Sequence, residues 1–289
     1  MEDLLQDVIS HIKECARIPS FSSYEERLHP YIKRSFSSMN TFSAVEVPGN
    51  NLIFDTGATI KDDTKTIALA AHLDKINHYG KNYPGKLPVV ETDGYLEGIM
   101  DDATGLGILL GIAGYLDQAD ITNRYLFFFS EMEESKGLRE HPELLKNGGE
   151  GYDHGMGAKS ISRRCMELNI WPDLVVTVDT TPLFEGDPGI ALYSKHWELN
   201  DLEATSDLVN NTRQVVDEFI DIDSTIKLDN NTNDYLHYGY EFNTDADRPV
   251  VSIALEPAIY PYHQLGEQVY KKDIARVVNI LITHLVKNR

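Results

Sequence analysis

The chain has 289 residues, 42% of them hydrophobic, which is enough to form a sizeable core in one large α/β domain or two small ones. Its 46 acidic and 26 basic residues give a formal net charge of −20. This charge argues against nucleic acid and anionic membranes as partners, because both would be repelled. It favours cationic substrates or metal ions, or it serves only to keep the protein soluble.

The two cysteines, Cys15 and Cys165, are too few for a disulfide framework and lack the C-x-x-C spacing of a thiolate metal site. Any metal must therefore be held by His, Asp and Glu. The N-terminus carries acids among its apolar residues and lacks the basic start and long apolar core of a signal peptide. No apolar run approaches the roughly 20 residues of a membrane span, so we expect a cytoplasmic protein.

In chain order, apolar residues at helical spacing predict a helix over residues 2–16, and Ser23 is a candidate cap for a second helix. Five apolar or β-branched runs then predict strands at residues 50–55, 66–71, 125–130, 174–178 and 250–255. Several of these runs lack polar alternation, which is typical of strands covered by helices on both faces. The pattern predicts a three-layer α/β/α fold with a mixed, mostly parallel central sheet. We expect one domain over residues 1–289, with a polar insertion or loop at about 136–159.

Side chains that can bind metal follow four of the predicted strands, directly or after a short connection. They are His72 and Asp74, Glu133 and Glu134, Asp179, and His263. In open α/β sheets ligands bind beyond the carboxyl ends of the strands, so these groups should converge.

Asp101 and Asp102 precede a further apolar segment of helical length. The glycines that follow them do not match G-x-G-x-x-G, which argues against a dinucleotide-binding loop. An acid at a helix start is ordinarily a favourable contact with the helix dipole.

Each of these residues, taken alone, has an ordinary structural explanation, such as a surface histidine, a turn or a solvated charge pair. Together they are harder to explain, because an uncompensated carboxylate or imidazole is costly at the end of a buried strand. Metal coordination accounts for all of them at once. Two histidines and three carboxylates suit a pair of zinc-like ions roughly 3.5–4 Å apart, if one carboxylate bridges them.

Two further roles follow from local geometry. Asp74 lies on the same side of an extended segment as His72, where it can accept a hydrogen bond from the imidazole and fix the ring. Of the neighbours Glu133 and Glu134, one can bind metal while the other takes a proton from water.

Five motifs in order, AHLDKI, GIMDDATGLG, SEMEESKG, VTVDTT and YHQLGE, resemble those of the co-catalytic di-zinc exopeptidases. The resemblance extends from ARIPSFSSYEE almost to the C-terminus. It implies that Asp101 bridges two Zn²⁺ ions, for which Mn²⁺ or Co²⁺ can substitute. The remaining ligands would be His72 and Asp179 on one ion and Glu134 and His263 on the other. Glu133 would be the general base and Asp74 the acid behind His72. In several branches of this clan the peptide bond after the bridging aspartate is cis, which here would be the Asp101–Asp102 bond.

Within the clan the motifs look closest to those of the TET-like aminopeptidases. Those enzymes insert a domain between the first histidine and the bridging aspartate, whereas here the gap from His72 to Asp101 is 101 − 72 = 29 residues. The Arg-Tyr usual before their last histidine is also absent. We therefore expect a monomer or small homo-oligomer.

The expected function is that of an aminopeptidase acting on a small peptide or peptide-like substrate. One alternative is an N-acyl amino acid deacylase or carboxypeptidase with the same two-metal site, which would be favoured by a free Lys or Arg positioned for a substrate carboxylate. The other is a scaffold that binds peptides without cleaving them. The presence of Glu133 argues against the scaffold, because binding alone does not require a general base.

Overall fold

The computed structural model describes residues 1–57, 64–134, 141–244 and 248–287. Within these residues an eight-stranded mixed sheet forms the centre of the molecule, in the spatial order β1-β2-β6-β3-β7-β10-β8-β9. The bounds of its strands are Ser43–Val45 (β1), Leu52–Asp55 (β2), Thr66–His72 (β3), Arg124–Ser130 (β6), Leu174–Val178 (β7), Ile190–Tyr193 (β8), Lys227–Asp229 (β9) and Val251–Pro257 (β10).

The five strands predicted from apolar runs all occur, as β2, β3, β6, β7 and β10. Strands β6, β3, β7 and β10 are neighbours and run parallel. Almost all of their residues are buried, which explains why their sequences lack polar alternation.

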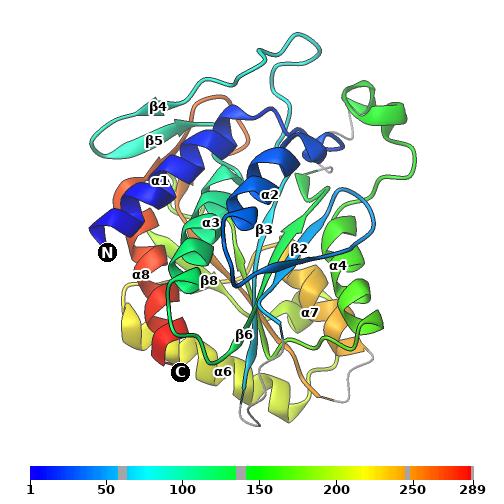
Figure 1. The fold of residues 1–289 in the computed structure, drawn as a ribbon, viewed down its shortest axis with the longest axis vertical. Helices are drawn as coiled ribbons and strands as arrows, with labels where there is room; N and C mark the ends of the chain where they lie inside the picture. Colours follow the sequence, from blue (N-terminus) through cyan, green and yellow to red (C-terminus); the bar gives the residue numbers. More distant parts are fainter. Residues whose placement is uncertain (58–63, 135–140, 245–247, 288–289) are drawn as a thin grey trace.

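Helices cover both faces of this sheet, as Figure 1 shows. One face carries α1 (Glu2–Arg17), α2 (His29–Ser37), α3 (Ala103–Asp117), α6 (Ser206–Ile222) and α8 (Lys271–Lys287). The other face carries α4 (Met156–Glu167) and α7 (Asp234–Thr244), and the short α5 (His196–Leu199) packs against α7. Alternate residues of β3 enter the two cores, with Leu69 on the first face and Ala68 on the second. The predicted three-layer α/β/α fold is confirmed.

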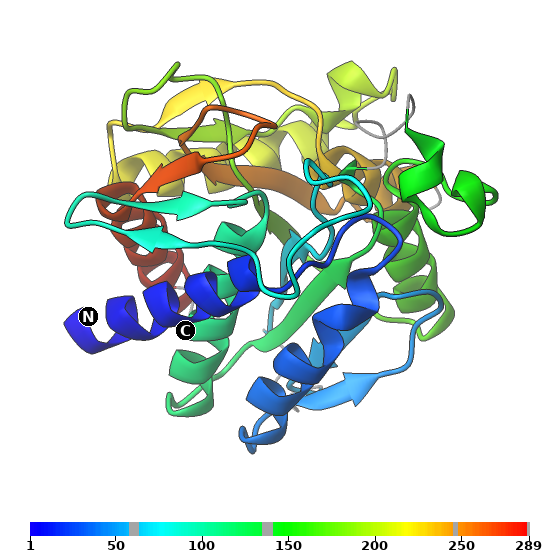
Figure 2. The ribbon, with the colours of Figure 1, turned by 90° about the horizontal axis from the view of Figure 1, so that it is seen from above.

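A smaller antiparallel sheet, absent from the sequence prediction, has the order β11-β12-β5-β4. Its strands are Val90–Glu91 (β4), Tyr95–Gly98 (β5), Ile259–Tyr260 (β11) and Glu267–Tyr270 (β12). In Figure 2 the cyan β4–β5 hairpin lies beside α1 and the orange segment that contains β12. Because Gly98 pairs with Glu267 in this sheet, the residues just before α3 are held next to β12.

The predicted cap at Ser23 is wrong. A 3-10 helix occupies Glu25–Arg27, and α2 begins only at His29, without a side-chain cap. The Ser23 hydroxyl instead accepts a hydrogen bond from the backbone of Lys146 (2.9 Å), and the Ser23 backbone N–H is bound by the Glu25 carboxylate (2.7 Å). The cap-like sequence therefore stabilises a connection between two loops.

The polar stretch at 136–159 lies partly outside the described residues, at 136–140. Its described part contains two 3-10 turns, Pro142–Leu144 and Lys146–Gly149, and the first residues of α4. No helix among the described residues is both long and apolar enough to cross a membrane.

Candidate metal centre

The predicted site residues converge at one edge of the central sheet. His72 is the last residue of β3, Glu133 and Glu134 follow β6, and Asp179 follows β7. Because these strands are parallel, their carboxyl ends meet at the same edge. Asp101 reaches the same place from the segment before α3, and His263 from the loop between β11 and β12.

Asp101 lies between the two histidines. Its Oδ1 is 3.0 Å from Nε2 of His72, and its Oδ2 is 3.5 Å from Nε2 of His263. Glu267 on β12 accepts hydrogen bonds from the backbone N–H groups of Met100 (2.7 Å) and Asp101 (3.2 Å). The bond between Asp101 and Asp102 is cis. The two oxygens of one carboxylate thus face two imidazoles, as a bridging ligand requires.

His72 is buried and contacts acids through both ring nitrogens. Its Nε2 lies 3.5 Å from Oδ1 of Asp179 in addition to its contact with Asp101. Its Nδ1 lies 3.0 Å from the backbone carbonyl of Asp74. Because a carbonyl only accepts, Nδ1 carries the proton, and in the neutral ring the lone pair of Nε2 points toward Asp101 and Asp179.

His263 and Glu134 form the other half of the centre, with Nε2 of His263 3.1 Å from Oε1 of Glu134. His263 has a positive φ of 53° and stacks on the Tyr262 ring at 3.7 Å. Burial lowers the pKa of His263, but its contacts with Asp101 and Glu134 outweigh burial and raise the pKa to about 10. Burial, and then the charge of Asp101, raise the pKa of Glu134 to about 7.

Asp74 supports the site differently from the prediction. Its carboxylate oxygen is 3.5 Å from Nδ1 of His72, so the shorter contact with the ring comes from its backbone carbonyl. The carboxylate accepts hydrogen bonds from the backbone N–H groups of Glu133 and Glu134, both at 3.0 Å, and from the Ser22 hydroxyl at 2.7 Å. Asp74 therefore fixes the backbone from which the two glutamates project.

The Glu133 side chain is buried, and no hydrogen bond to its carboxylate occurs within the described part of the chain. Burial, and then the charge of Glu134, raise the pKa of Glu133 well above its ordinary value. A carboxylate that is held beside the cluster yet has no donor among the described residues is available to a substrate or to water.

The donor set fits divalent metal ions. Ligand atoms within 4.8 Å of one another occur in three groups: His72, Glu133 and Glu134; His72, Asp102 and Asp179; and Asp101, Glu134 and His263. Nε2 of His263 is buried and has no well-directed hydrogen bond to a described residue, although Oε1 of Glu134 is 3.1 Å away. Positive ions would stabilise the ionised carboxylates, whose charged forms are costly to bury unpaired.

Asp102 belongs to one of these groups by distance, but its role in the fold is to cap α3. Its Oδ1 accepts a hydrogen bond from the backbone of Gly105 (2.6 Å). Its Oδ2 is buried without a partner among the described residues. Asp102 is therefore the acid that stabilises the start of the helix, while Asp101 faces the histidines.

Residues not singled out from the sequence also shape the site. Glu267 closes the YHQLGE motif and binds the backbone of Asp101. Asp234, at the start of α7, is buried and accepts a hydrogen bond from the Ser130 hydroxyl. Its charge contributes to the raised pKa of Glu133. No strand-end pattern marks Asp234, because it reaches the site from a helix on the second face of the sheet.

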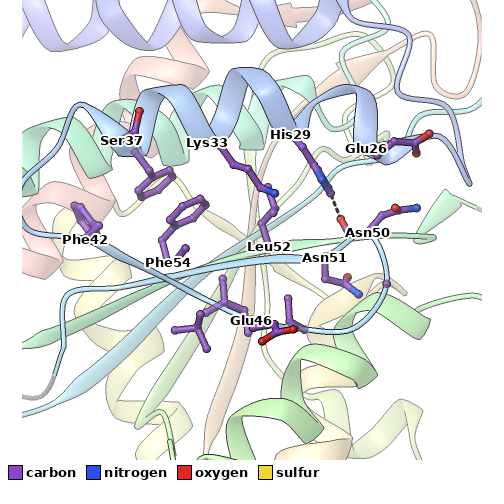
Figure 3. Close-up of a pocket in the computed structure, with 16 residues that line it drawn as sticks. Glu26, His29, Lys33, Ser37, Phe42, Glu46, Asn50, Asn51, Leu52 and Phe54 are labelled. Atoms are coloured by element: carbon purple, nitrogen blue, oxygen red, sulfur yellow. Dashed lines mark hydrogen bonds between the residues drawn. The ribbon is translucent and has the colours of Figure 1, made fainter.

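Two cavities of similar size differ in their relation to this centre. One, of about 750 Å³, lies between α2 and the β1–β2 segment, and none of the predicted site residues is in its wall. Figure 3 shows its aromatic end, with Phe54 and Phe42, and its polar end, where His29 is hydrogen-bonded to the backbone of Asn50. The other, of about 720 Å³, includes His263 in its wall. Only the second cavity adjoins the candidate metal centre.

The fold is similar to those of several solved peptidases. An aminopeptidase from Desulfurococcus kamchatkensis is 13% identical, with a TM-score of 0.66 over 97% of this chain and 95% of that chain. The aminopeptidase PepT from Bacillus cereus is 12% identical, with a TM-score of 0.66 over 98% of each chain. The TET1 peptidase from Pyrococcus horikoshii is 15% identical, with a TM-score of 0.63 over 95% of this chain and 98% of that chain. At these identities the likeness concerns the fold.

Sequence comparison with curated proteins found no match. The model of peptidase family M28 matches residues 51–278, which include every predicted site residue. The chain, with its histidines and carboxylates gathered at the ends of the central strands, therefore belongs to peptidase family M28.

Proposed function

We propose that this metal-dependent peptidase is an aminopeptidase that uses two divalent ions, zinc in the first instance, and Glu133 as its general base. The observation that carries the proposal is the position of Asp101, whose two carboxylate oxygens lie 3.0 Å and 3.5 Å from the imidazoles of His72 and His263. One carboxylate between two histidines, each with a further acid beside it, matches the ligand set of a bridged pair.

In this proposal Asp101 would be a ligand of both ions. His72 and Asp179 complete one site, and their side-chain atoms are 3.5 Å apart. Glu134 and His263, 3.1 Å apart, complete the other. When bound, such a pair of ions polarises the scissile carbonyl and acidifies a water molecule.

Glu133 then moves the protons of the reaction. Its carboxylate accepts a proton as the water oxygen bonds to the carbonyl carbon, and it delivers that proton to the nitrogen of the leaving amine as the C–N bond breaks. The products are a carboxylic acid and an amine. Asp74 holds the backbone of Glu133 and Glu134 throughout, so that the base and its metal-binding neighbour keep separate positions.

An N-acyl amino acid deacylase or carboxypeptidase would use the same residues on a substrate that is recognised by its free carboxylate instead of its free amine. The two functions are separated by giving zinc-, manganese- or cobalt-loaded protein a set of aminoacyl anilides and a set of N-acetyl amino acids. The aminopeptidase proposal predicts release of the anilide, and loss of that activity when a chelator removes the metal. Cleavage of the N-acetyl set alone would replace it with the deacylase.

A scaffold that binds peptides without cleaving them predicts a different outcome. Loaded protein would bind aminoacyl peptides and hydrolyse none of them with any of the three metals. The buried Glu133, whose carboxylate has no hydrogen-bond donor among the described residues, favours the enzyme over the scaffold.

A further inference from the structure

The cavity beside His263 is formed by three segments that are distant in the sequence. They are the loop that follows β3, the turn around Pro142–Leu144, and the loop that carries His263. Its volume of about 720 Å³ is within the roughly 300–1,000 Å³ that is typical of small-molecule sites. Because His263 also contacts Asp101 and Glu134, this cavity adjoins the residues at which a substrate would be held.

The ionisable side chains in its wall are mostly basic. They include His78, Lys81, His141 and His263, with Glu143 as the acid in the wall. Glu143 already has a partner, because its Oε1 lies 3.3 Å from Nδ1 of His141. This lining contrasts with the chain as a whole, which carries a net charge of −20.

Two of these groups have no partner of their own within the described residues. Nε2 of His78 is buried without a hydrogen bond. Lys81 is exposed and forms no salt bridge with a described residue. A buried donor left unpaired costs free energy, and a ligand that accepts from it removes that cost.

The ligand that satisfies both groups is an anion with several acceptor atoms. Burial lowers the pKa of His78, so the ring is neutral at neutral pH and donates through Nε2 in the tautomer that carries its proton there, while Lys81 supplies the positive charge. A carboxylate accepts only, and its two oxygens can bind two donors at once. Peptides carry such a group at their C-terminus and on acidic side chains.

We propose that this cavity is a subsite for a carboxylate of the substrate, bound by Lys81 and by the His78 ring. The inference rests on the proposed metal-dependent hydrolysis, since it assumes that the scissile bond lies at Asp101 and Glu134. A lysine positioned for a carboxylate also suits a deacylase or carboxypeptidase, and the assay with aminoacyl anilides and N-acetyl amino acids decides between these functions. The carboxylate has two sources, the C-terminus of a short peptide or an acidic side chain. The first source would select dipeptides and other very short substrates, and the second would select acidic residues.

Equilibrium binding tests the subsite without requiring turnover. The protein is the zinc-loaded Glu133→Gln variant, and calorimetry measures Kd for two matched ligand pairs. Leu-Ala against Leu-Ala-amide reports on a C-terminal carboxylate, and Glu-Ala-amide against Gln-Ala-amide reports on an acidic side chain. The same pairs are then measured after adding Lys81→Met, His78→Leu or the control Lys86→Met, which changes an exposed lysine outside the cavity wall.

The proposal expects one pair to favour its carboxylate member by about 10- to 100-fold in Kd, as for a hydrogen bond to a charged group. Lys81→Met should remove most of this preference and His78→Leu part of it, whereas Lys86→Met should preserve it. Equal Kd values within both pairs would overturn the subsite, as would a loss of preference that is as large with Lys86→Met as with Lys81→Met.

The two proposals can fail separately. If the wild type hydrolyses aminoacyl anilides while neither ligand pair shows a preference, the peptidase function stands and the subsite is wrong. If a preference depends on Lys81 but the wild type cleaves no peptide or anilide, the subsite stands and the proposed catalysis is wrong.

Discussion

Glu133 and Glu134 are adjacent residues in different environments. Glu134 lies 3.1 Å from His263 and within reach of Asp101, whereas the Glu133 carboxylate has no hydrogen bond to another described residue. Both backbone N–H groups are bound by the single carboxylate of Asp74. One supporting acid thus holds the backbone of two side chains of the same chemistry that lie in different surroundings.

Two nearly identical substitutions should therefore fail in different ways. Glu133→Gln keeps the size of the side chain but removes the base, and we expect kcat to fall by about 10²- to 10⁴-fold with metal content unchanged. Glu134→Gln should lose one ion and the part of the thermal stability that its binding supplies. Steady-state kinetics, elemental analysis and thermal unfolding of both variants measure this. If the Glu133 variant lost metal and the Glu134 variant kept both ions, the two roles would be exchanged.

At this scale the sequence predicts which residues meet but not how they make contact. Apolar strands that end in His72, Glu133 or Asp179 predict convergence because parallel strands share an edge. Neither the use of the Asp74 backbone carbonyl for the imidazole nor the binding of Asp101 by Glu267 could be predicted. Both depend on distances between segments that only the folded sheet brings together.

Helices α1 and α3 pack unusually closely through small residues. A Cβ added to Gly107 would lie 2.3 Å from the Ile12 side chain and 2.5 Å from its backbone nitrogen. Gly111 faces Val8 in the same way one turn further along α3. Gly114 on the same helix is different, because its nearest neighbour would be Met39 at 3.9 Å. Close packing here fixes the helix whose N-terminus adjoins Asp101.

This contrast predicts opposite effects for the same substitution. Gly107→Ala should destabilise the protein by about 1–3 kcal/mol, because the Ile12 backbone cannot move away without shifting α1. Gly114→Ala should stabilise it by about 0.4–1 kcal/mol, because alanine is the better helix former and has room. Denaturant unfolding measures both changes. A Gly107→Ala variant as stable as the wild type would contradict the close packing of α1 on α3.

Elements were predictable where one pattern dominated. The central strands β3, β6, β7 and β10 are continuous apolar runs, and α1 has a clear apolar face. Strands such as β5 and β12 have only four residues with alternate burial, so their sequences resemble loops. The prediction of a helix cap at Ser23 failed because the Ser23 hydroxyl accepts a hydrogen bond from the backbone of Lys146, 123 residues away.

At the scale of the whole molecule, the segment between His72 and Asp101 bears on the oligomeric state. The segment between His72 and Asp101 contains only the β4–β5 hairpin as regular structure, and this hairpin pairs with β12 of the same chain. The Pyrococcus horikoshii TET1 peptidase is described as assembling into a tetrahedron or a large octahedral shell. Because this hairpin pairs with a strand of its own chain, it does not form a separate inserted domain through which copies could assemble.

We therefore predict a monomer or small homo-oligomer, which the net charge of −20 also favours through repulsion between copies. Multi-angle light scattering at physiological salt measures the mass directly, and the expected value is that of one to a few chains of 32.6 kDa. A dodecamer would show that the large assemblies need no inserted domain.

The metal content of the saturated protein tests the central claim of a carboxylate-bridged ion pair. Zinc-loaded wild type, freed of loosely bound metal and analysed for its elements, should carry two ions per chain. Asp101→Ala should lose both, because its two oxygens face both histidines, whereas His72→Ala should retain the ion of Glu134 and His263. A saturated wild type with one ion or none, or an Asp101→Ala variant that still holds two, would contradict the bridged pair.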